Sequence, residues 1–373
     1  MAGEPLFPVG VPAGAGQVVD REAFIDEVVT RLADRQSVVL AGPRRTGKTS
    51  LGHEVLRRLE AADGTMTAAV DLATASSVRD LAERLTLACL ENLSPGARVA
   101  RRVRGGLDAL LAQPEVRAKA YELEVSLALR REAERQPPER LLDEALALPQ
   151  RMAAQAKRGF VVLFDEFQLI GGLGIPAILA RMRGTFQLQS RCSFLFLGSH
   201  GGMLAHLFGA RSQPFFRFAT MLDVPPVPAE AWRAYIRERL GSRGVEIDDE
   251  ALDVLLEQTG GHPYDTMRTA YEAHLLLARA HRLGASLMLG ACARVQAQLA
   301  AVFDAEADAA GPRARAVLGR IAKGEGLYAG DRSKGAVALA IRALLAAGML
   351  VRTGRGHYEF TERMMARHMG RGT

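Results

Sequence analysis

The segment Gly42–Thr49, GPRRTGKT, combines residue types that can hold a phosphate group. It fits the pattern G-x-x-x-x-G-K-[ST], in which glycines let backbone amides turn inward toward phosphate oxygens. Lys48 is one of only five lysines among 48 basic residues, and its compact ammonium suits such a cradle better than the planar fork of arginine. The Thr49 hydroxyl is a suitable Mg²⁺ ligand. The residues expected to contact nucleotide phosphates are Gly42, Pro43, Arg44, Arg45, Thr46, Gly47, Lys48, Thr49 and Ser50.

A second pattern, GFVVLFDEFQ at Gly159–Gln168, supplies the acids that phosphate chemistry needs. Five apolar residues in succession predict a strand that ends at two carboxylates. Asp165 at the strand tip is expected to hold Mg²⁺, directly or through water. Glu166 is expected to be the general base that polarises an attacking water. Gln168 either orients that water or begins the next helix, and the pattern favours the helix start.

The elements that position these residues alternate between strand and helix. Residues Ser37–Ala41 fit a buried strand, and the residues from Ser50 onward fit a helix. Further expected strands lie within 65–74, 159–168 and 191–200 and just before Val224. Residues 94–158 have a helical pattern throughout. Because helices separate the strands, the pattern predicts an α/β P-loop core with a parallel sheet over residues 1–222.

The remainder of the chain has a different pattern. After Val224–Trp232 the strands are expected to stop, and successive helices predict an α-helical lid over residues 223–304, with Gly260 and Gly261 ending one of the helices. Residues 305–373 fit two helices followed by a strand, a turn and a strand. This order predicts a winged helix.

Composition limits the class of protein. With 48% hydrophobic and 24% charged residues among 373, the chain is typical of water-soluble globular proteins of more than one domain. Three widely spaced cysteines fit neither a disulfide framework nor a zinc site, and they favour a reducing compartment. No apolar run approaches the roughly 18 to 20 residues of a membrane span. We therefore expect a cytoplasmic protein without membrane contact.

Positive charge is concentrated near the C-terminus. Residues 313–373 contain twelve Lys and Arg against four Asp and Glu, a net charge of +8, whereas the preceding residues sum to −2. This distribution suggests a polyanionic partner for residues 313–373. A merely solvated basic surface explains the charge equally well.

Taken together, these residues resemble the archaeal-type ATPases of the STAND class, relatives of the AAA+ proteins that pair a P-loop core with a helical lid and a winged helix. The resemblance covers nearly the whole chain and depends on GPRRTGKTSL, DEFQ, FLFLGSH, PFFRFA and TGGHPYDTM. It departs from the family at His200, at Arg268, which falls late for a lid sensor arginine, and between the two phosphate-site motifs.

The resemblance implies further site residues. Ser199 would occupy the sensor position beside the γ-phosphate. Arg217 matches the arginine after the post-sensor helix, which would act as an arginine finger on the transferred phosphoryl group, in cis or in trans. Gly261 and Pro263 match the lid motif that approaches the adenine or its ribose, and Val19 lies in the segment that contacts the base. On the residues alone, Ser199 suits a helix cap, Arg217 a loop contact with an acidic neighbour, and Pro263 a helix start. His53 and His262 are expected to be structural.

Three functions fit this sequence. The first is an ATP-binding, slowly ATP-hydrolysing regulatory switch that uses Mg²⁺ and controls the winged helix. The second is an AAA+-like ATPase that binds duplex DNA through residues 313–373. The third is a non-catalytic nucleotide-binding scaffold for a protein partner or for self-association. Glu166 beside Asp165 argues against the scaffold, and the resemblance favours the switch.

Overall fold

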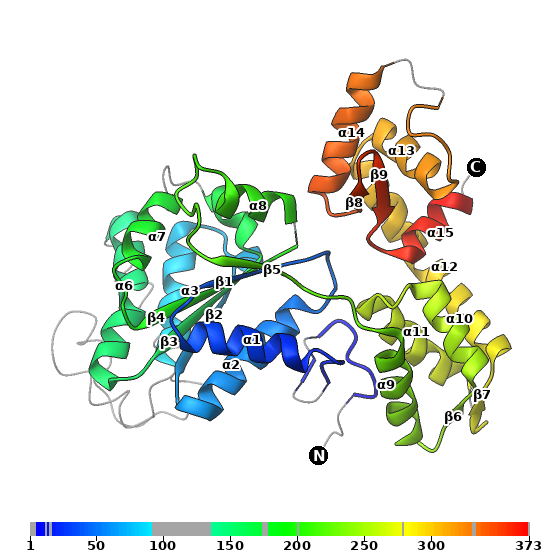
Figure 1. Cartoon of the computed structure of the whole chain (residues 1–373), viewed down its shortest axis with the longest axis horizontal. Helices are drawn as coiled ribbons and strands as arrows, with labels where there is room; N and C mark the ends of the chain where they lie inside the picture. Colours follow the sequence, from blue (N-terminus) through cyan, green and yellow to red (C-terminus); the bar gives the residue numbers. More distant parts are fainter. Residues whose placement is uncertain are drawn as a thin grey trace.

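Figure 1 shows the computed structural model of the chain, which describes residues 5–11, 13–14, 17–91, 136–173, 178–199, 201–277, 280–329 and 333–371. Most of the expected helical segment 94–158 lies outside the described residues. Its described part contains α6 (Pro138–Ala156), which begins with a proline in its first turn and carries Pro149 inside.

The core is a five-stranded sheet in the order β2-β3-β4-β1-β5, and every neighbouring pair of strands is parallel. The strands are β1 (Val38–Ala41), β2 (Met66–Asp71), β3 (Phe160–Asp165), β4 (Cys192–Gly198) and β5 (Thr220–Asp223). Every residue of β1, β3 and β4 is buried, as continuous apolar runs require when both faces are covered. The predicted parallel α/β fold is confirmed.

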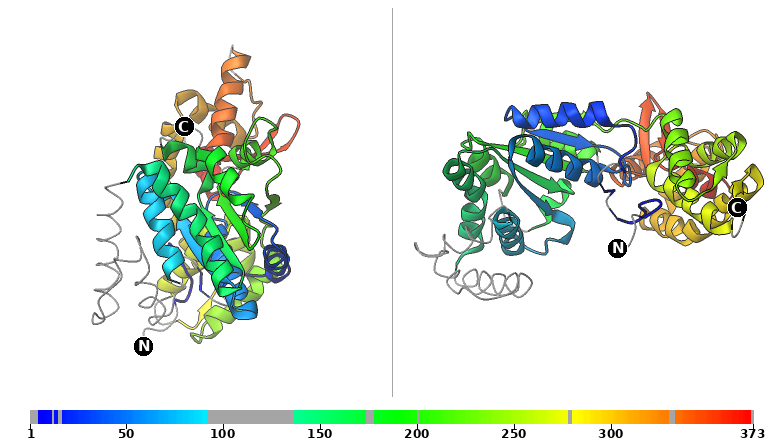
Figure 2. Two further views of the ribbon diagram at one scale, coloured as in Figure 1. Left: turned by 90° about the vertical axis from the view of Figure 1, so that its left-hand side faces the viewer. Right: turned by 90° about the horizontal axis from the view of Figure 1, so that it is seen from below.

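Helices cover both faces of this sheet (Figures 1 and 2). One face carries α1 (Glu22–Ala33) and α2 (Lys48–Asp63), and the other carries α3 (Val78–Leu90), α6, α7 (Ile178–Phe186) and α8 (Gly201–Gly209). A cluster of phenylalanines fills the second face, where the rings of Phe167 and Phe196 lie 4.6 Å apart. Phe167 begins the short 3-10 helix η4 (Phe167–Leu173), so its burial anchors the residues directly after Asp165 and Glu166.

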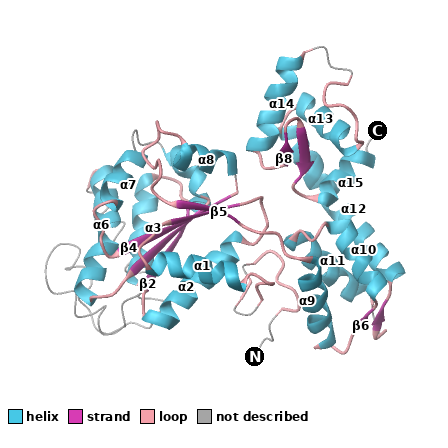
Figure 3. Cartoon of the chain, viewed as in Figure 1, coloured by secondary structure: helices cyan, strands magenta, loops and turns pink. Residues whose placement is uncertain are grey.

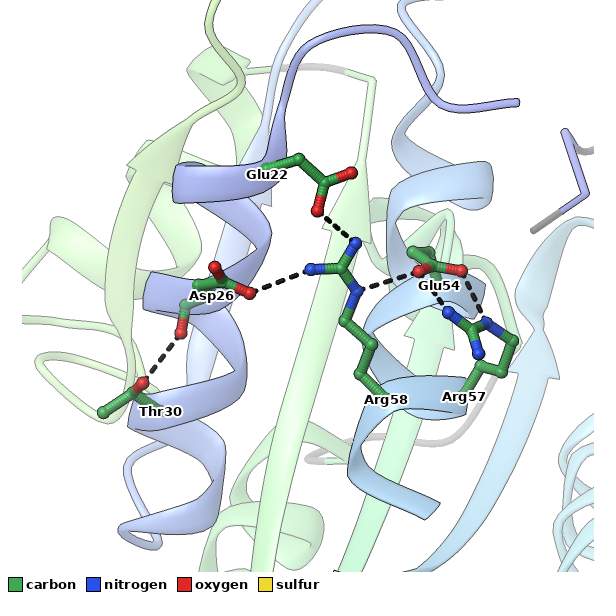
Figure 4. A network of polar contacts seen from close by, with 6 residues as sticks. All are labelled: Glu22, Asp26, Thr30, Glu54, Arg57 and Arg58. Atoms are coloured by element: carbon green, nitrogen blue, oxygen red, sulfur yellow. Dashed lines mark hydrogen bonds and ion pairs between the residues drawn. The ribbon is translucent and has the colours of Figure 1, made fainter. Parts of the chain in front are cut away.

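An ion-pair network joins α1 to α2 (Figure 4). Arg58 Nη1 donates to Asp26 and Nε donates to Glu54, each over 2.8 Å, and its third nitrogen pairs with Glu22. The hydrogen bond from Arg57 to Glu54 is the main cause of the lowered pKa of the Glu54 carboxyl. Because α2 starts at Lys48, the network fixes the helix that carries the phosphate-loop lysine against α1.

The helices after β5 pack around a second apolar cluster, which includes Trp232 and Leu252. They are α9 (Ala229–Gly241), α10 (Asp249–Thr259), α11 (Pro263–Leu276) and α12 (Ala285–Ala309). The expectation that strands stop here is wrong in one detail, because β6 (Glu246–Ile247) pairs in parallel with β7 (Arg282–Leu283). Figure 3 shows this pair at the far edge of the helices. Two residues are too few for a period-2 pattern to reveal.

The C-terminal segment, residues 312–371, forms a third cluster. It contains α13 (Pro312–Ala322), α14 (Lys334–Ala346), the antiparallel strands β8 (Leu350–Gly354) and β9 (His357–Phe360), and α15 (Arg363–Arg371). The order helix, helix, strand, strand agrees with the sequence expectation. The last helix, α15, was not predicted, although Met364, Met365 and Met369 give it a buried face.

Helix α12 joins the second and third clusters. Met288 and Cys292 belong to the former, whereas Val295 and Phe303 belong to the latter. By length and composition alone, α12 is the one described helix that could cross a membrane, a test that the core helix of a soluble protein also passes. Arg294, which pairs with Glu272 over 2.6 Å, interrupts the apolar residues of α12. The mean hydropathy of the helix nevertheless stays high.

The close packing of α2 on the sheet generates a stability prediction. A Cβ at Gly52 would lie 2.6 Å from Leu163 Cδ1 and 2.8 Å from Leu197 Cδ1. We expect Gly52→Ala to lower the free energy of unfolding by about 1–3 kcal/mol, because these buried leucines would have to move. Gly290→Ala is the control, since Gly290 lies within α12 with open space around it. It should raise the free energy of unfolding by about 0.5–1 kcal/mol.

Urea unfolding followed by circular dichroism measures both changes. An unchanged midpoint for Gly52→Ala would show that α2 packs less closely on β3 and β4 than described.

Candidate nucleotide-binding site

The predicted phosphate loop connects β1 to α2, at the carboxyl edge of the sheet. Gly47 caps α2 with φ 87°, a left-handed conformation that favours glycine. Arg45 also has a positive φ, 60°, and is a non-glycine residue held in an unfavourable region. The first amides of α2 and its positive dipole end therefore face the loop, as a phosphate site requires.

Lys48 is buried in this loop. Its Nζ donates to the carbonyl oxygens of Gly42 and Pro43, over 3.0 and 2.5 Å. Burial lowers the pKa of Lys48 to about 8, although the charges of Glu166 and Asp165 act in the opposite direction. A bound phosphate adds negative charge at this point and would raise the pKa again. An anion bound in the loop would thus stabilise the charged form of Lys48.

Thr49 and Asp165 form a pair of oxygen ligands. Thr49 Oγ1 donates to Asp165 Oδ2 over 2.6 Å, and burial raises the pKa of Asp165 above its usual value. A hydroxyl beside a carboxylate fits Mg²⁺, which takes few protein ligands and keeps water and phosphate oxygens as the others. Among the described residues no group of three or more His, Cys, Asp or Glu side chains could hold a metal ion.

Glu166, Gln168 and Ser199 lie together at the tips of β3 and β4. Ser199 Oγ donates to Glu166 Oε2 over 2.9 Å, and Gln168 Nε2 donates to the same oxygen and also to Ser199 Oγ, the latter over 3.2 Å. Glu166 has φ 49°, and its amide donates to Asp165 Oδ1 over 2.8 Å. The structure therefore brings the expected base and sensor together. Gln168 does lie in η4, as the sequence favoured, but its side chain faces Glu166.

Arg21 is a residue that the sequence did not single out. Its guanidinium donates to the carbonyl oxygens of Thr46, over 2.7 Å, and Pro225, over 2.8 Å. Burial lowers the pKa of Arg21 to about 10. Arg21 thus ties the phosphate loop to the connection between β5 and α9, and only its tertiary position reveals this role.

A cavity of about 290 Å³ adjoins the phosphate loop. Val19, Pro263 and Glu166 line it together with residues from Arg45 to Ser50. The apolar residues Pro8, Val18, Val227, Trp232, Tyr264 and Met267 also line it and were not predicted. Gly261 does not line the cavity itself, but its carbonyl oxygen accepts a hydrogen bond over 2.9 Å from Nε1 of Trp232, which does. A mostly apolar wall beside a phosphate loop suits a planar base.

The N-terminal residues help to close this cavity. The amide of Ala13 donates to Ser50 Oγ over 2.9 Å, and Arg239 of α9 donates to the carbonyls of Leu6 and Pro5. Figure 2 shows the segment between the sheet core and the helices after β5. It therefore bridges the phosphate loop and α9.

His262, Asp265 and Glu362 form a buried cluster beside the loop. His262 Nε2 lies 3.1 Å from the carbonyl oxygen of Arg44, and Nδ1 lies 3.4 Å from Asp265 Oδ2. Burial alone lowers the pKa of His262, but the hydrogen bond and charge of Asp265 outweigh it and the pKa is raised. Arg45 pairs with Glu362 over 3.7 Å and stacks on Tyr264. The loop thus contacts both α11 and the residue that precedes α15.

Arg217 is not brought to this site. It precedes β5, whose end near Asp223 lies beside Ala41 and the loop, so Arg217 lies at the opposite, amino edge of the sheet. There it lines a separate cavity with Arg35 and Cys192. Any role at a nucleotide therefore concerns a neighbouring copy and stays a prediction. His53 is exposed on α2, and His200 lies outside the described residues.

Arg268 of α11 makes local contacts. It donates to the Tyr264 hydroxyl over 2.7 Å and to Gln298 over 3.0 Å. It therefore supports a residue of the cavity wall.

No family model and no curated protein matches the chain. Among solved structures, a Walker-type ATPase of Pyrococcus abyssi aligns with 98% of this chain and 99% of its own, with a TM-score of 0.72 and 16% identity. The ORC2 protein of Aeropyrum pernix, solved in ADPNP–ADP complexes, aligns over 98% and 96%, with a TM-score of 0.61 and 13% identity. At these identities the similarity concerns the fold alone: the chain has the P-loop NTPase fold.

Proposed function

We propose that this protein is a Mg²⁺-dependent ATP-hydrolysing switch whose nucleotide state controls its C-terminal segment. The proposal depends on one observation: the phosphate loop also contacts the start of α11 and the C-terminal segment. Lys48 and Thr49 would bind phosphate and Mg²⁺, while Arg44 and Arg45 of the same loop contact His262 and Glu362. A ligand that changes this loop must change those contacts as well.

Each residue has a defined task in this proposal. Lys48 neutralises phosphate charge, and Thr49 with Asp165 would hold Mg²⁺, which bridges phosphate oxygens when bound. Glu166 would accept the proton of the attacking water, and Ser199 would report the γ-phosphate. The cavity lined by Val19, Tyr264 and Met267 would receive the base. The complexes of the ORC2 protein with ADPNP and ADP support an adenine nucleotide as the ligand.

The three parts would act as core (1–222), lid (223–304) and winged helix (305–373). In the present arrangement the last part lies against the core near the phosphate loop and near the end of β4. Glu362 pairs with Arg45 of the loop, and a Cβ at Gly348 would lie 3.5 Å from the carbonyl oxygen of Ser199. We infer that this arrangement restrains hydrolysis and that ATP, with Mg²⁺, favours its release.

The first test concerns the phosphate site. Lys48→Ala should abolish binding of Mg·ATP, because a buried positive charge that faces the phosphates is lost. Glu166→Gln should bind ATP normally but hydrolyse it at least about 100-fold more slowly, the typical loss for a general base. Fluorescent-nucleotide titration and phosphate release measure the two effects. Normal turnover by Glu166→Gln would refute the role of Glu166, and nucleotide binding without hydrolysis by the native protein would leave the scaffold function.

The second test concerns the restraint. Glu362→Gln removes the ion pair to Arg45 with little change in shape, and we expect hydrolysis to rise about fivefold, equivalent to ~1 kcal/mol for a partly exposed pair. Glu359→Gln on the exposed face of β9 is the matched control and should have no effect. Equal hydrolysis rates for Glu362→Gln and the native protein would contradict a restraining contact.

A second candidate function is binding of duplex DNA. The charged residues Lys334 and Arg342 of α14 and Arg352 and Arg355 of the β8–β9 hairpin are all exposed. The exposed face of α14 otherwise presents Leu339 and alanines, which cannot read base edges. Contacts would therefore be mainly to phosphates and weakly selective for sequence.

Titration of labelled duplex at two salt concentrations, with ATP and with ADP, tests this candidate. Four phosphate contacts predict a slope of about −3.6 in log K against log salt, and Arg352→Ala with Arg355→Ala should reduce its magnitude by about 1.8. Absence of binding at low salt in both nucleotide states would exclude DNA and leave the restraining role for this segment.

A further inference from the structure

We propose that Gln168 is a positioning residue that fixes the carboxylate of Glu166 for water activation. This inference rests on the proposed ATP hydrolysis and adds a residue to it. Gln168 Nε2 donates to Glu166 Oε2 and, over 3.2 Å, to Ser199 Oγ. Ser199 Oγ donates to the same Glu166 oxygen over 2.9 Å. The three side chains form a closed triangle at the ends of β3 and β4.

The side chain of Gln168 is buried and closely packed at this position. Only 7% of Gln168 is exposed, and a Cβ at Gly198 would lie 2.4 Å from Gln168 Oε1. The glutamine therefore fits only because β4 ends in glycine. Its Oε1 is buried without a hydrogen-bond partner among the described residues, an unfavourable state that a helix start does not require. Both donors of the amide nitrogen are directed to the site instead.

The triangle leaves one carboxylate oxygen for the reaction. Oε2 of Glu166 accepts from two donors, whereas no described residue donates to Oε1, and Glu166 lines the cavity beside the phosphate loop. The amide of Glu166 is also fixed to Asp165 Oδ1, so its backbone is held to the expected Mg²⁺ ligand. A base held at one oxygen presents the other in a defined direction to water.

Gln168 also supplies a hydrogen bond to Glu166 that Ser199 alone could not maintain. The hydroxyl of Ser199 has one proton, so it cannot donate to Glu166 and to a γ-phosphate oxygen at the same time. The amide nitrogen of Gln168 has two, and it already donates to both partners. When Ser199 turns its proton to phosphate, Gln168 keeps Glu166 in place and still donates to Ser199 Oγ. Glu166 therefore stays aligned when Ser199 contacts the γ-phosphate.

The experiment compares Gln168→Met, which keeps the length of the side chain but removes its donors, with native protein. We expect kcat to fall about 10- to 100-fold, as for loss of a hydrogen bond to a charged group, while KM and Kd for ATP change less than twofold. Gln168→Asn, which keeps the amide but is one methylene shorter, should show the same loss. Thermal unfolding and nucleotide binding verify that both variants fold.

A double variant separates positioning from a structural role. In single-turnover measurements, Gln168→Met combined with Glu166→Gln should be no slower than Glu166→Gln alone, because Gln168 acts only through Glu166. Equal losses in both backgrounds, or a Gln168→Met kcat within twofold of native, would overturn the positioning role. If the native protein hydrolyses ATP and Glu166→Gln does not, such a result refutes Gln168 alone. A native protein without hydrolysis refutes both proposals.

Discussion

The carbonyl oxygens of the phosphate loop impose the constraint on which the rest of the site depends. A loop that directs its amides to phosphate must direct its carbonyls elsewhere, and buried carbonyls need donors. Here Lys48 donates to the carbonyl oxygens of Gly42 and Pro43. Arg21 donates to the carbonyl oxygen of Thr46, and Nε2 of His262 lies within hydrogen-bond distance of that of Arg44. The donors come from α2, from the start of α1 and from the start of α11. The loop geometry is therefore held by parts of the chain more than 200 residues apart.

These donors also explain why buried charge gathers around the loop. His262, Asp265 and Glu362 are each less than a tenth exposed, and burial is the main cause of the raised pKa of Glu362. Removing one partner from such a group leaves another buried charge uncompensated. The cluster connects the loop to the start of α11 and to the residue before α15.

The sequence predicted the parts of this molecule that local patterns encode. The strands β1, β3 and β4 were expected because each is a continuous apolar run, and Lys48, Thr49, Asp165 and Glu166 were expected because their spacing follows from phosphate chemistry. Arg21 and Glu362 were missed because each acts on a residue distant in sequence. Gln168 was assigned to a helix start, which is correct for its backbone and leaves out its side chain. Arg217 could not be placed, since only the strand direction shows which edge of the sheet it occupies.

The C-terminal segment touches two different elements of the site, and this has a consequence for how it can move. Glu362 pairs with the loop, and Gly348, which ends α14 in a left-handed conformation with φ 72°, approaches the backbone of Ser199. Both residues lie in the C-terminal segment, whose apolar side chains, including Leu344, Leu350 and Met365, form one cluster. If the segment moves as one body, it leaves the loop and Ser199 together. Two weak contacts on one body then act as a single, cooperative contact with the residues that would bind the terminal phosphate.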